Sequence, residues 1–467
     1  MNFEAALSYL LSLGHETLTI KLGLRNTETL LAALGDPHRE FPSVQIAGTN
    51  GKGSTAVILD SICRAAGIRT GLFTSPHLIS ITERLRIAGE QVSETDFARL
   101  TTQVKECAEE LVARGRLETL PTFFEHVTAI ALLAFREAKV ELAILETGLG
   151  GRLDSTTAAG ADIVAITPVA MDHEEYLGDS LAEIAAEKAA IIRPGVTAIV
   201  APQIEEALRV IVRQCQSAGV EPRLLSGLQP TPARDSDRSG FRTDLVNTTG
   251  DGRGIVTFET DNSVYENVTI GLRGRHQIGN ASTAIALAEA LCERGFPITR
   301  EAITTGVETA THPGRLEIWE GRPEILFDGA HNPAAARALR DYLNEFVKQP
   351  ITMIFGAMKD KALPEMTATL FPKANELILT SMDNPRAAKA EALMSAVPVN
   401  FDKARLRLAS SAQEAVQLAK ELTPADGLVC VTGSLYLIGA IQETLREGEA
   451  RTSHHDERGL STVLRPI

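Results

Sequence analysis

The sequence predicts an α/β protein of two domains, each built on a largely parallel, doubly wound sheet. Its 467 residues exceed the roughly 100–200 residues of a typical single domain. From Ser43 onward, short apolar or β-branched runs alternate with stretches in which apolar residues recur at helical spacing. The alternation starts again after a turn-forming break at Pro313, and it is typical of strands joined by crossover helices.

The first series supplies the elements of the larger predicted domain. Short apolar runs predict strands at 44–47, 70–73, 142–146, 163–167 and 198–201. Helices are predicted between flanking Gly, Pro or polar residues, at 54–66, 94–114, 123–137, 180–192, 204–218, 278–294 and 299–309. Residues 227–262 are rich in Asp, Arg, Thr, Ser and Gly, and we expect loops and short hairpin strands there.

The second series predicts a smaller Rossmann-like domain. Its strands are expected at 324–327, 352–355, 376–380 and 428–432, and its helices at 333–346, 387–396, 411–422 and 435–446. The sequence His312-Pro313-Gly314 marks the break between the two series. We therefore expect domains at 1–310 and 311–446, followed by a flexible tail at 447–467.

Composition excludes several classes of function. Lys and Arg total 46 against 60 Asp and Glu, and the net charge of −14 argues against a nucleic-acid or anionic-lipid partner. The five cysteines are scattered without a CxxC pair, which argues against a zinc site and favours a reducing cytoplasm. The N-terminus lacks the pattern of a signal peptide, and no apolar stretch reaches the roughly 20 residues of a membrane span. We expect a cytoplasmic protein that acts on small molecules.

A glycine-rich loop, GTNGKGST at 48–55, lies between the first predicted strand and the helix that follows it. Glycines let backbone amides approach phosphate oxygens, the helix N-terminus favours anions, and the Lys52 ammonium can bridge terminal phosphates. The loop departs from the general GxxxxGK[ST] form, because Ile46 replaces the first glycine and Gly53 separates Lys52 from Ser54. Its strand-to-helix setting predicts a phosphate site, with ATP as the favoured ligand.

Three further strand ends carry polar residues that suit the same site. Glu146 ends one predicted strand, Asp172-His173 follows another, and Ser75 follows a third. The carboxyl ends of parallel strands share one edge of a sheet, so these side chains are expected near Lys52. A carboxylate there suits Mg²⁺, which prefers oxygen ligands. The residue pattern alone gives Lys188, in the predicted helix 180–192, no role beyond that of a solvated or snorkelling lysine.

Eight motifs occur in the order found in the folylpolyglutamate synthase and dihydrofolate synthase family, within the wider Mur ligase superfamily, and the chain resembles that family from about residue 10 to about residue 440. The motifs are GTNGKGS, TSPHL followed by Glu83-Arg84, ETGLGGRLD, MDH, EKAAIIRPG, GRHQIGNA, HPGRLE and DGAHNPAA. The resemblance implies a Mur-ligase-type P-loop ATPase domain that also holds the folate site, followed by a Rossmann-like glutamate ligase domain.

The resemblance also implies roles for individual residues. Phosphate binding is implied for Gly51, Lys52, Gly53 and Ser54. Mg²⁺ ligation is implied for Ser75, Glu146 and His173. Lys188 matches a lysine that is often carbamylated in the family and would then bind a second Mg²⁺. Lys52, His173 and Lys188 are the expected catalytic residues, and a monovalent cation is a further candidate.

Nucleotide and pterin contacts are implied as well. Family contacts to ATP match Asn280, Arg315, Asp328 and His331. Positions that shape the pterin site match Phe123, Phe124, Glu125, Leu153, Asp154 and Ser155, where an aromatic face and a carboxylate suit a flat, hydrogen-bonding heterocycle. Three departures from the family pattern, at Lys21, Thr157 and Ala362, bear more on the dihydropteroate activity than on ligation.

The predicted reaction is ATP-dependent ligation of L-glutamate to a dihydropteroate or folate carboxylate through an acyl phosphate, by a monomeric enzyme. One alternative is a Mur-type ligase that acts on a UDP-linked peptidoglycan precursor; it is disfavoured because only about forty residues precede the loop. The other alternative is a P-loop nucleotide switch without ligase chemistry. The sequence leaves open whether one chain carries out both dihydrofolate synthesis and polyglutamate extension.

Overall fold

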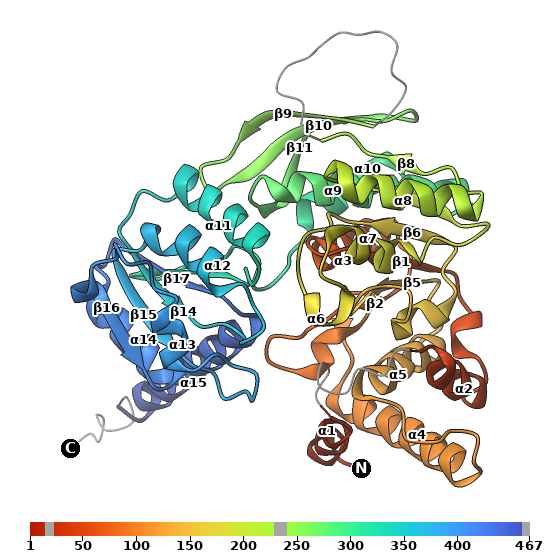
Figure 1. Cartoon of the computed structure of the whole chain (residues 1–467), viewed down its shortest axis with the longest axis horizontal. Helices are drawn as coiled ribbons and strands as arrows, with labels where there is room; N and C mark the ends of the chain where they lie inside the picture. The colour runs from red at the N-terminus through yellow and green to blue at the C-terminus, as the bar shows by residue number, and fades with distance from the viewer. Residues whose placement is uncertain (15–22, 228–240, 460–467) are drawn as a thin grey trace, which may run out of the picture. The chain divides into compact units, whose positions relative to one another are not determined.

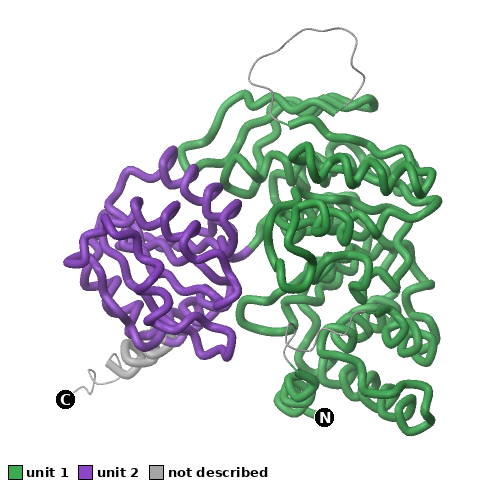
Figure 2. Tube along the Cα trace, in the orientation of Figure 1, with its two compact units in different colours: residues 1–312 green, residues 313–467 purple. Residues whose placement is uncertain are grey.

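The computed structural model describes residues 1–14, 23–227 and 241–459. The chain forms two compact units, residues 1–312 and residues 313–467 (Figure 2). Each unit contains its own sheet and its own hydrophobic core, and each is described here by itself.

Unit 1 is built on an eight-stranded sheet in the order β4-β3-β2-β5-β1-β6-β7-β8 (Figure 1). All neighbouring strands are parallel except the β2–β3 and β3–β4 pairs, which are antiparallel. The strands are β1 (Ser43–Ala47), β2 (Thr70–Phe73), β3 (Leu85–Ile87), β4 (Glu90–Gln91), β5 (Leu142–Glu146), β6 (Ile163–Ile166), β7 (Thr197–Val200) and β8 (Arg223–Leu224). Since β1, β2, β5 and β6 run in the same direction, the residues that follow them lie at one edge of the sheet.

The helices of unit 1 cover both faces of this sheet. They are α1 (Phe3–Ser12), α2 (Arg25–Ala33), α3 (Lys52–Ala65), α4 (Glu94–Ala113), α5 (Phe123–Glu137), α6 (Glu174–Leu177), α7 (Leu181–Ala189), α8 (Glu205–Ala218), α9 (His276–Glu293) and α10 (Arg300–Thr309). Alternate strand residues divide between the faces: Ile46 and Ile144 pack with α3 and α9, whereas Ala143 and Leu145 pack with α4 and α5. Residues of β6 and β7 on that second side, such as Ile166, pack with α7 and α8.

A three-stranded antiparallel sheet, in the order β11-β10-β9, adds a further layer to unit 1. Its strands are β9 (Arg242–Thr248), β10 (Arg253–Glu259) and β11 (Val264–Arg273). Its buried residues, including Val256, Phe258 and Ile270, join the same core as α3, α9 and α10. The small sheet therefore supports the side of α3 and α9, the two helices whose N-terminal ends lie at the loop after β1.

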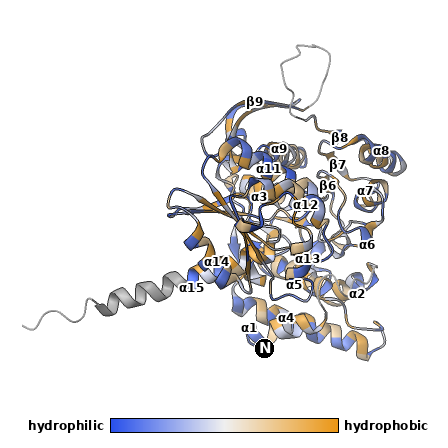
Figure 3. Cartoon of the chain, turned by 60° about the vertical axis from the view of Figure 1, so that its left-hand side comes forward, coloured by the Kyte–Doolittle hydropathy of each residue, from blue (hydrophilic) through white to orange (hydrophobic). Residues whose placement is uncertain are grey.

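Unit 2 has a six-stranded sheet in the order β12-β13-β17-β14-β15-β16, parallel except for the β12–β13 pair. The strands are β12 (Glu317–Trp319), β13 (Glu324–Asp328), β14 (Ile351–Phe355), β15 (Glu376–Thr380), β16 (Leu406–Ala409) and β17 (Leu428–Thr432). The helices are α11 (Pro333–Phe346), α12 (Leu363–Leu370), α13 (Ala390–Ser395), α14 (Ala412–Leu422) and α15 (Leu435–Gly459). The central strands β14 and β17 are buried along their whole length, and Figure 3 shows how hydrophobic residues are distributed over the described strands and helices.

The structure confirms the doubly wound α/β fold and the strands predicted in both series. The second predicted series ends at residue 446, whereas helix α15 continues to Gly459. The flexibility expected of the tail stays a prediction. The sequence interpretation also missed α2, α12, β11 and β16, which are short or only half-buried.

None of the described helices combines the length and the hydropathy that a bilayer crossing requires.

Candidate active site

The loop between β1 and α3 has a backbone that only glycine permits at two positions. Gly48 has φ 150°, and a Cβ atom there would lie 1.9 Å from the Thr167 Oγ1 atom. Gly51 has φ 88°, and a Cβ atom there would lie 2.2 Å from the Asn280 Oδ1 atom. The glycines therefore let the loop pass closely between Thr167, which follows β6, and Asn280 of α9.

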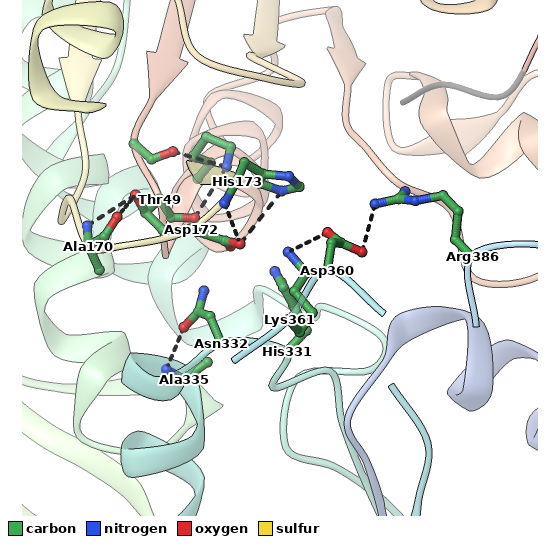
Figure 4. Close-up of polar contacts among 12 residues, drawn as sticks. Thr49, Ala170, Asp172, His173, His331, Asn332, Ala335, Asp360, Lys361 and Arg386 are labelled. Carbon is green, nitrogen blue, oxygen red and sulfur yellow. Dashed lines mark hydrogen bonds and ion pairs between the residues drawn. The ribbon is translucent and has the colours of Figure 1, made fainter. Parts of the chain in front are cut away.

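The segment after β6 clamps this loop in place. The Thr49 hydroxyl donates to the Ala170 carbonyl at 3.0 Å, and the Ala170 amide donates back to the hydroxyl at 3.1 Å (Figure 4). The amides of Thr49 and Asn50 both donate to the Pro168 carbonyl at 3.1 Å. This double attachment fixes the loop before any ligand binds.

Lys52 stands at the first position of α3, and its ammonium lies back over the loop. Its Nζ atom donates to the Gly48 carbonyl at 3.1 Å and to the Thr49 carbonyl at 3.3 Å. The N-terminus of α3 adds the positive end of a helix dipole at the same place. Ser54, in the first turn of α3, is buried, and its Oγ atom lies 3.2 Å from His312 Nδ1. The geometry suits the oxygens of a polyphosphate.

Asn280 reaches this loop from α9, and a buried neighbour holds it. The Asn280 Nδ2 atom donates to Gln277 Oε1 at 2.8 Å, and Gln277 is only 1% exposed. The Oδ1 atom of Asn280 occupies the space that a side chain at Gly51 would fill. α9 therefore fixes one wall of the phosphate loop.

Glu146 ends β5, the strand next to β1, and it is only 5% exposed. Its Oε2 atom accepts a hydrogen bond from the Ser75 amide at 3.0 Å. A Cβ atom at Gly53 would lie 3.2 Å and 3.3 Å from the two carboxylate oxygens, which places them directly beside the start of α3. The carboxylate and the phosphate loop thus share one edge of the sheet.

His173 and Asp172 follow β6 at the same edge. The His173 backbone has φ 53°, and its amide donates to Asp172 Oδ1 at 2.9 Å. The His173 Nε2 atom lies 3.9 Å from the same carboxylate oxygen (Figure 4). A positive φ is uncommon for a residue other than glycine, and here it lies at the N-cap of α6.

The described residues contain no cluster of three or more His, Cys, Asp or Glu side chains arranged to hold a metal ion. Mg²⁺ does not require such a cage, because it commonly takes one or two carboxylates together with water and substrate phosphate oxygens. The buried Glu146 carboxylate beside a phosphate loop is a donor set of this kind. The residues therefore fit a divalent cation bound together with a nucleotide.

Lys188, near the end of α7, is only 4% exposed. Burial, and after it repulsion by the Lys52 ammonium, lower the pKa of its amine to about 7. A large share of the amine is therefore neutral near pH 7. The carbonyls of Glu187 and Lys188 lie against Gly151, and the Arg152 amide donates to the Glu187 carbonyl at 2.9 Å, so α7 is tied to the loop after β5.

The predicted pterin residues differ in how far they can reach a ligand. Glu125 is buried and accepts from the Thr122 amide at 2.6 Å, so its carboxylate caps α5. Asp154 is buried and accepts from the amides of Leu149 and Thr156, so its carboxylate shapes the loop after β5; burial raises its pKa.

The remaining predicted pterin residues are hydrophobic or small. The hydroxyls of Ser155 and Thr128 form a hydrogen bond at 2.6 Å. The Arg84 guanidinium lies over the buried Phe123 ring, 5.5 Å from its centroid. Phe124 and Leu153 are partly exposed. The Phe124 ring lies 5.8 Å from the Phe73 ring and fills the space beside Gly148. These two side chains are the members of the set best placed to contact a ligand.

Unit 2 brings Arg315, Asp328 and His331 together at the end of β13. Arg315 Nη1 donates to the Gly329 carbonyl at 3.2 Å, and His331 Nδ1 lies 2.8 Å from the same oxygen. Asp328 accepts from the amides of Leu316 and Ala330, both at 3.1 Å. Burial raises the pKa of the Asp328 carboxyl to about 6, although the Arg315 guanidinium opposes the shift.

The departures from the family pattern occupy different settings. Thr157 belongs to a buried network, in which it donates to the Gly151 carbonyl at 2.7 Å and accepts from Gln45 Nε2 at 2.7 Å. Ala362 precedes α12 in unit 2. Lys21 lies outside the described residues. The sequence interpretation assigned no role to Gln277, and it used His312 only to mark a domain boundary.

Two family models match the chain. Residues 46–288 match the Mur ligase middle domain, and residues 314–435 match the Mur ligase glutamate ligase domain. The phosphate loop and the end of β5 lie in the first of these ranges, and Arg315, Asp328 and His331 lie in the second. The two matches define the class of the chain: it has the middle domain and the glutamate ligase domain of the Mur ligases.

Curated relatives show to which family within the Mur ligases the chain is similar. A dihydrofolate synthase/folylpolyglutamate synthase from Bacillus subtilis is 33% identical over 91% of this chain and 96% of the relative. A probable bifunctional folylpolyglutamate synthase/dihydropteroate synthase from Halobacterium salinarum is 36% identical over 94% of this chain and 51% of the relative. The chain spans about half the length of this relative and of its counterpart from Haloferax volcanii.

Solved structures of the same family superpose on the chain over nearly its whole length. Folylpolyglutamate synthase of Mycobacterium tuberculosis, complexed with ADP, superposes with a TM-score of 0.85 at 30% identity, over 95% of this chain and 98% of that one. A bifunctional folylpolyglutamate synthase/dihydrofolate synthase with Mn, AMPPNP and L-glutamate bound gives 0.79 at 28% identity, over 96% and 98% of the two chains. The chain belongs to the folylpolyglutamate synthase and dihydrofolate synthase family.

Proposed function

We propose that the chain ligates L-glutamate to the carboxylate of dihydropteroate or a reduced folate, with ATP as the energy source. One observation carries the proposal: the buried Glu146 carboxylate lies beside the phosphate loop and is held there by the Ser75 amide at 3.0 Å. A fixed carboxylate beside a phosphate loop would repel a phosphate bound alone. It suits a nucleotide that is bound together with a divalent cation. The relatives named dihydrofolate synthase or folylpolyglutamate synthase support the same reaction.

The chemistry requires activation of a carboxylate, which is a poor acceptor for an amine. The pterin-linked carboxylate attacks the γ-phosphorus of ATP, the bond to the β–γ bridging oxygen breaks, and ADP leaves. The resulting acyl phosphate is then attacked by the neutral amine of glutamate, and inorganic phosphate departs as the amide forms. The amine proton is released to solvent. Two anions must approach each other in the first step, so neutralisation of charge is the main task of the site.

The chain's own residues supply part of that neutralisation. In the proposal, the amides of Gly51, Gly53 and Ser54 and the Lys52 ammonium bind the terminal phosphates. Lys52 needs only to turn from the carbonyls of Gly48 and Thr49 toward the ligand. Asn280 in unit 1, and Arg315, Asp328 and His331 in unit 2, are proposed as further nucleotide contacts.

Glu146, Ser75 and His173 are the residues proposed to hold Mg²⁺. When bound, the ion would neutralise phosphate charge and polarise the transferred phosphoryl group. His173 must be neutral to act as a ligand. Glu146 needs no rearrangement, since burial and the Ser75 amide already fix its carboxylate at the loop.

Lys188 is proposed to be carbamylated and to contribute to a second divalent site. Its pKa of about 7, lowered first by burial and then by Lys52, leaves a neutral amine that can attack CO₂. The new N–C bond yields a carbamate anion and releases a proton. The conversion replaces a buried cation beside Lys52 with an anion, which removes the repulsion between the two residues.

The pterin is proposed to lie against the partly exposed Phe124 and Leu153, because an aromatic face suits a flat heterocycle. In this arrangement Glu125 and Asp154 maintain the walls, since their carboxylates already accept backbone hydrogen bonds.

The five cysteines are free and spread over both units, which supports a reducing compartment such as the cytoplasm.

The direct test is glutamate-dependent ADP release by the full chain, with dihydropteroate and with tetrahydrofolate as separate acceptors. Release with one or both acceptors is expected, and the comparison tells whether the chain carries out one or both folate activities. A folded chain that binds ATP but releases no ADP with either acceptor would contradict the folate assignment. Slow turnover that no carboxylate acceptor stimulates would instead indicate a nucleotide switch.

Carbamylation has its own test. Lys188→Ala is expected to lose activity and to recover part of it when a short carboxylate such as acetate is added, because the added anion can fill the place of the carbamate. Full activity of the variant without an added carboxylate would refute the role of Lys188.

A further inference from the structure

Glu317, the first residue of β12, gathers three hydrogen bonds that the proposed reaction does not use. Its Oε2 atom accepts from the Gly314 amide at 2.8 Å and from Gln442 Nε2 at 2.9 Å. Its Oε1 atom accepts from Trp319 Nε1 at 2.8 Å. Gln442 lies in α15 and is only 1% exposed, so the carboxylate ties the turn before β12 to the interior of unit 2.

The turn that Glu317 holds contains a conformation that leucine rarely adopts. Leu316 is fully buried and has φ 46°, in the left-handed region. Its amide donates to Asp328 Oδ2 at 3.1 Å, and the Gly329 amide donates to the Gly314 carbonyl at 2.9 Å. Such a backbone conformation persists only where its surroundings stabilise it. Here the Glu317 carboxylate and the residues at the end of β13 both form hydrogen bonds with the turn.

The direction of Arg315 depends on this turn. Arg315 directly precedes Leu316. The φ value of Leu316 therefore sets the direction of the backbone that follows Arg315. The Arg315 guanidinium then reaches the Gly329 carbonyl at 3.2 Å and faces Asp328. If the turn relaxed to an ordinary conformation, the guanidinium would no longer be directed at the end of β13.

We propose that Glu317 is a positioning residue for nucleotide binding, which acts by holding the turn 314–316 so that Arg315 points along the end of β13. The proposal rests on the nucleotide role proposed above for Arg315. Glu317 itself need not touch the nucleotide, because its carboxylate is already engaged by three donors within unit 2.

Glu317→Gln is the sharpest perturbation. Glutamine is the same size, but its one carbonyl oxygen is uncharged. It can keep the contacts with the Gly314 amide and Gln442 only by giving up the one from Trp319, and both turn contacts lose the added strength of a charged acceptor. Glu320→Gln is the matched control, since Glu320 is exposed and lies only three residues away. The readouts are the dissociation constant of ATP for the full chain, measured by calorimetry, the unfolding midpoint, and the emission of Trp319, which is the protein's one tryptophan.

Glu317→Gln is expected to weaken ATP binding about five- to tenfold and to shift the Trp319 emission, because the indole N–H partner changes. Glu320→Gln is expected to change neither. In an Arg315→Ala background, Glu317→Gln should weaken ATP binding by less than about twofold, because a residue that acts through Arg315 has nothing left to position. Should Glu317→Gln not fold, Gln442→Leu removes one donor from the carboxylate and should weaken ATP binding in the same direction.

Two results would overturn the proposal. One is unchanged ATP affinity in Glu317→Gln or Gln442→Leu while the Trp319 emission shifts, which would reduce the carboxylate to a structural role. The other is an equal loss of affinity with and without Arg315. The test is decided by ATP binding, whereas the proposed function is decided by glutamate-dependent ADP release, so failure of one is distinguishable from failure of the other.

Discussion

The Ser75 amide donates to Glu146 Oε2 at 3.0 Å, and this contact joins the end of β2 to the end of β5 beside the phosphate loop. A backbone donor fixes the carboxylate without neutralising its charge, so the anion stays available to a cation from solvent. Both carboxylate oxygens lie beside Gly53, and the Ser75 amide uses only one lone pair of Oε2.

Glu146→Gln is expected to keep the fold and lose most of the ligase activity. The glutamine oxygen can still accept from the Ser75 amide, but the anion is gone. We expect kcat to fall on the order of 100-fold and the requirement for Mg²⁺ to rise, with an unfolding midpoint close to that of the wild type. The measurement is ADP release against Mg²⁺ concentration, with the exposed Glu90→Gln as control. Unchanged Mg²⁺ dependence would remove Glu146 from the metal site.

Gly48→Ala is expected to destabilise unit 1 and to abolish ATP binding. A Cβ atom at residue 48 would lie 1.9 Å from Thr167 Oγ1, at a φ of 150°. Thr167 is fully buried and cannot move away, so we expect a loss of about 2–3 kcal/mol in the free energy of unfolding. Gly250→Ala is the control, because nothing lies within 4 Å of a Cβ atom there. Urea unfolding of both variants checks the prediction, and equal stability would mean that the loop can relax.

The parts of the site that could be predicted from sequence are those encoded within a few neighbouring residues. The loop GTNGKGS and the acid at the end of β5 each follow a recognisable strand, and the sheet brings them to one edge. Gln277 and Asn280 are neighbours on one turn of α9, but the contact of Asn280 with Gly51 joins residues more than 200 positions apart in the chain. No local pattern encodes such a contact, because it depends on how α9 packs against α3.

The same reasoning explains what the sequence interpretation missed in the fold. The half-buried strand β16 and the short helix α12 carry weak periodicity. Glu125 and Asp154 match family positions that shape the pterin site, and this role stays a prediction. The structure adds that both carboxylates accept hydrogen bonds from nearby amides. The sequence shows which residue types are present but not which donor they face.

Gln277→Leu is expected to weaken ATP binding without harming the chemical step. Leucine fits a buried position but leaves the Asn280 Nδ2 atom without its acceptor at 2.8 Å. Asn280 should then lose its fixed orientation beside Gly51, and the dissociation constant of ATP should rise about three- to tenfold while kcat at saturating ATP changes little. Titration calorimetry and steady-state kinetics give the two numbers, with the exposed Gln216→Leu as control. A fall in kcat with unchanged affinity would contradict this role.

Lys188 should make the free energy of unfolding depend on pH in a specific window. Burial, followed by repulsion from Lys52, lowers the pKa of its amine from 10.5 to about 7 in the folded chain. Below about pH 7 the amine is protonated in both states, and the cost of burying a charge is present in full. Between about pH 7 and 10.5 the unfolded chain binds a proton that the folded chain does not, so this residue makes stability rise with pH.

Lys188→Met should remove that rise. In CO₂-free buffer, which keeps the amine unmodified, we expect the wild type to gain up to about 1.4 kcal/mol per pH unit relative to the variant over the lower part of the window. The variant should also be more stable than the wild type near pH 7, because methionine fills the buried space without a charge. Urea unfolding at pH 7, 8 and 9 measures the difference, with the exposed Lys420→Met as control. Parallel curves for wild type and Lys188→Met would show that the amine keeps an ordinary pKa, and the ready attack on CO₂ that the carbamylation proposal requires would lose its physical basis.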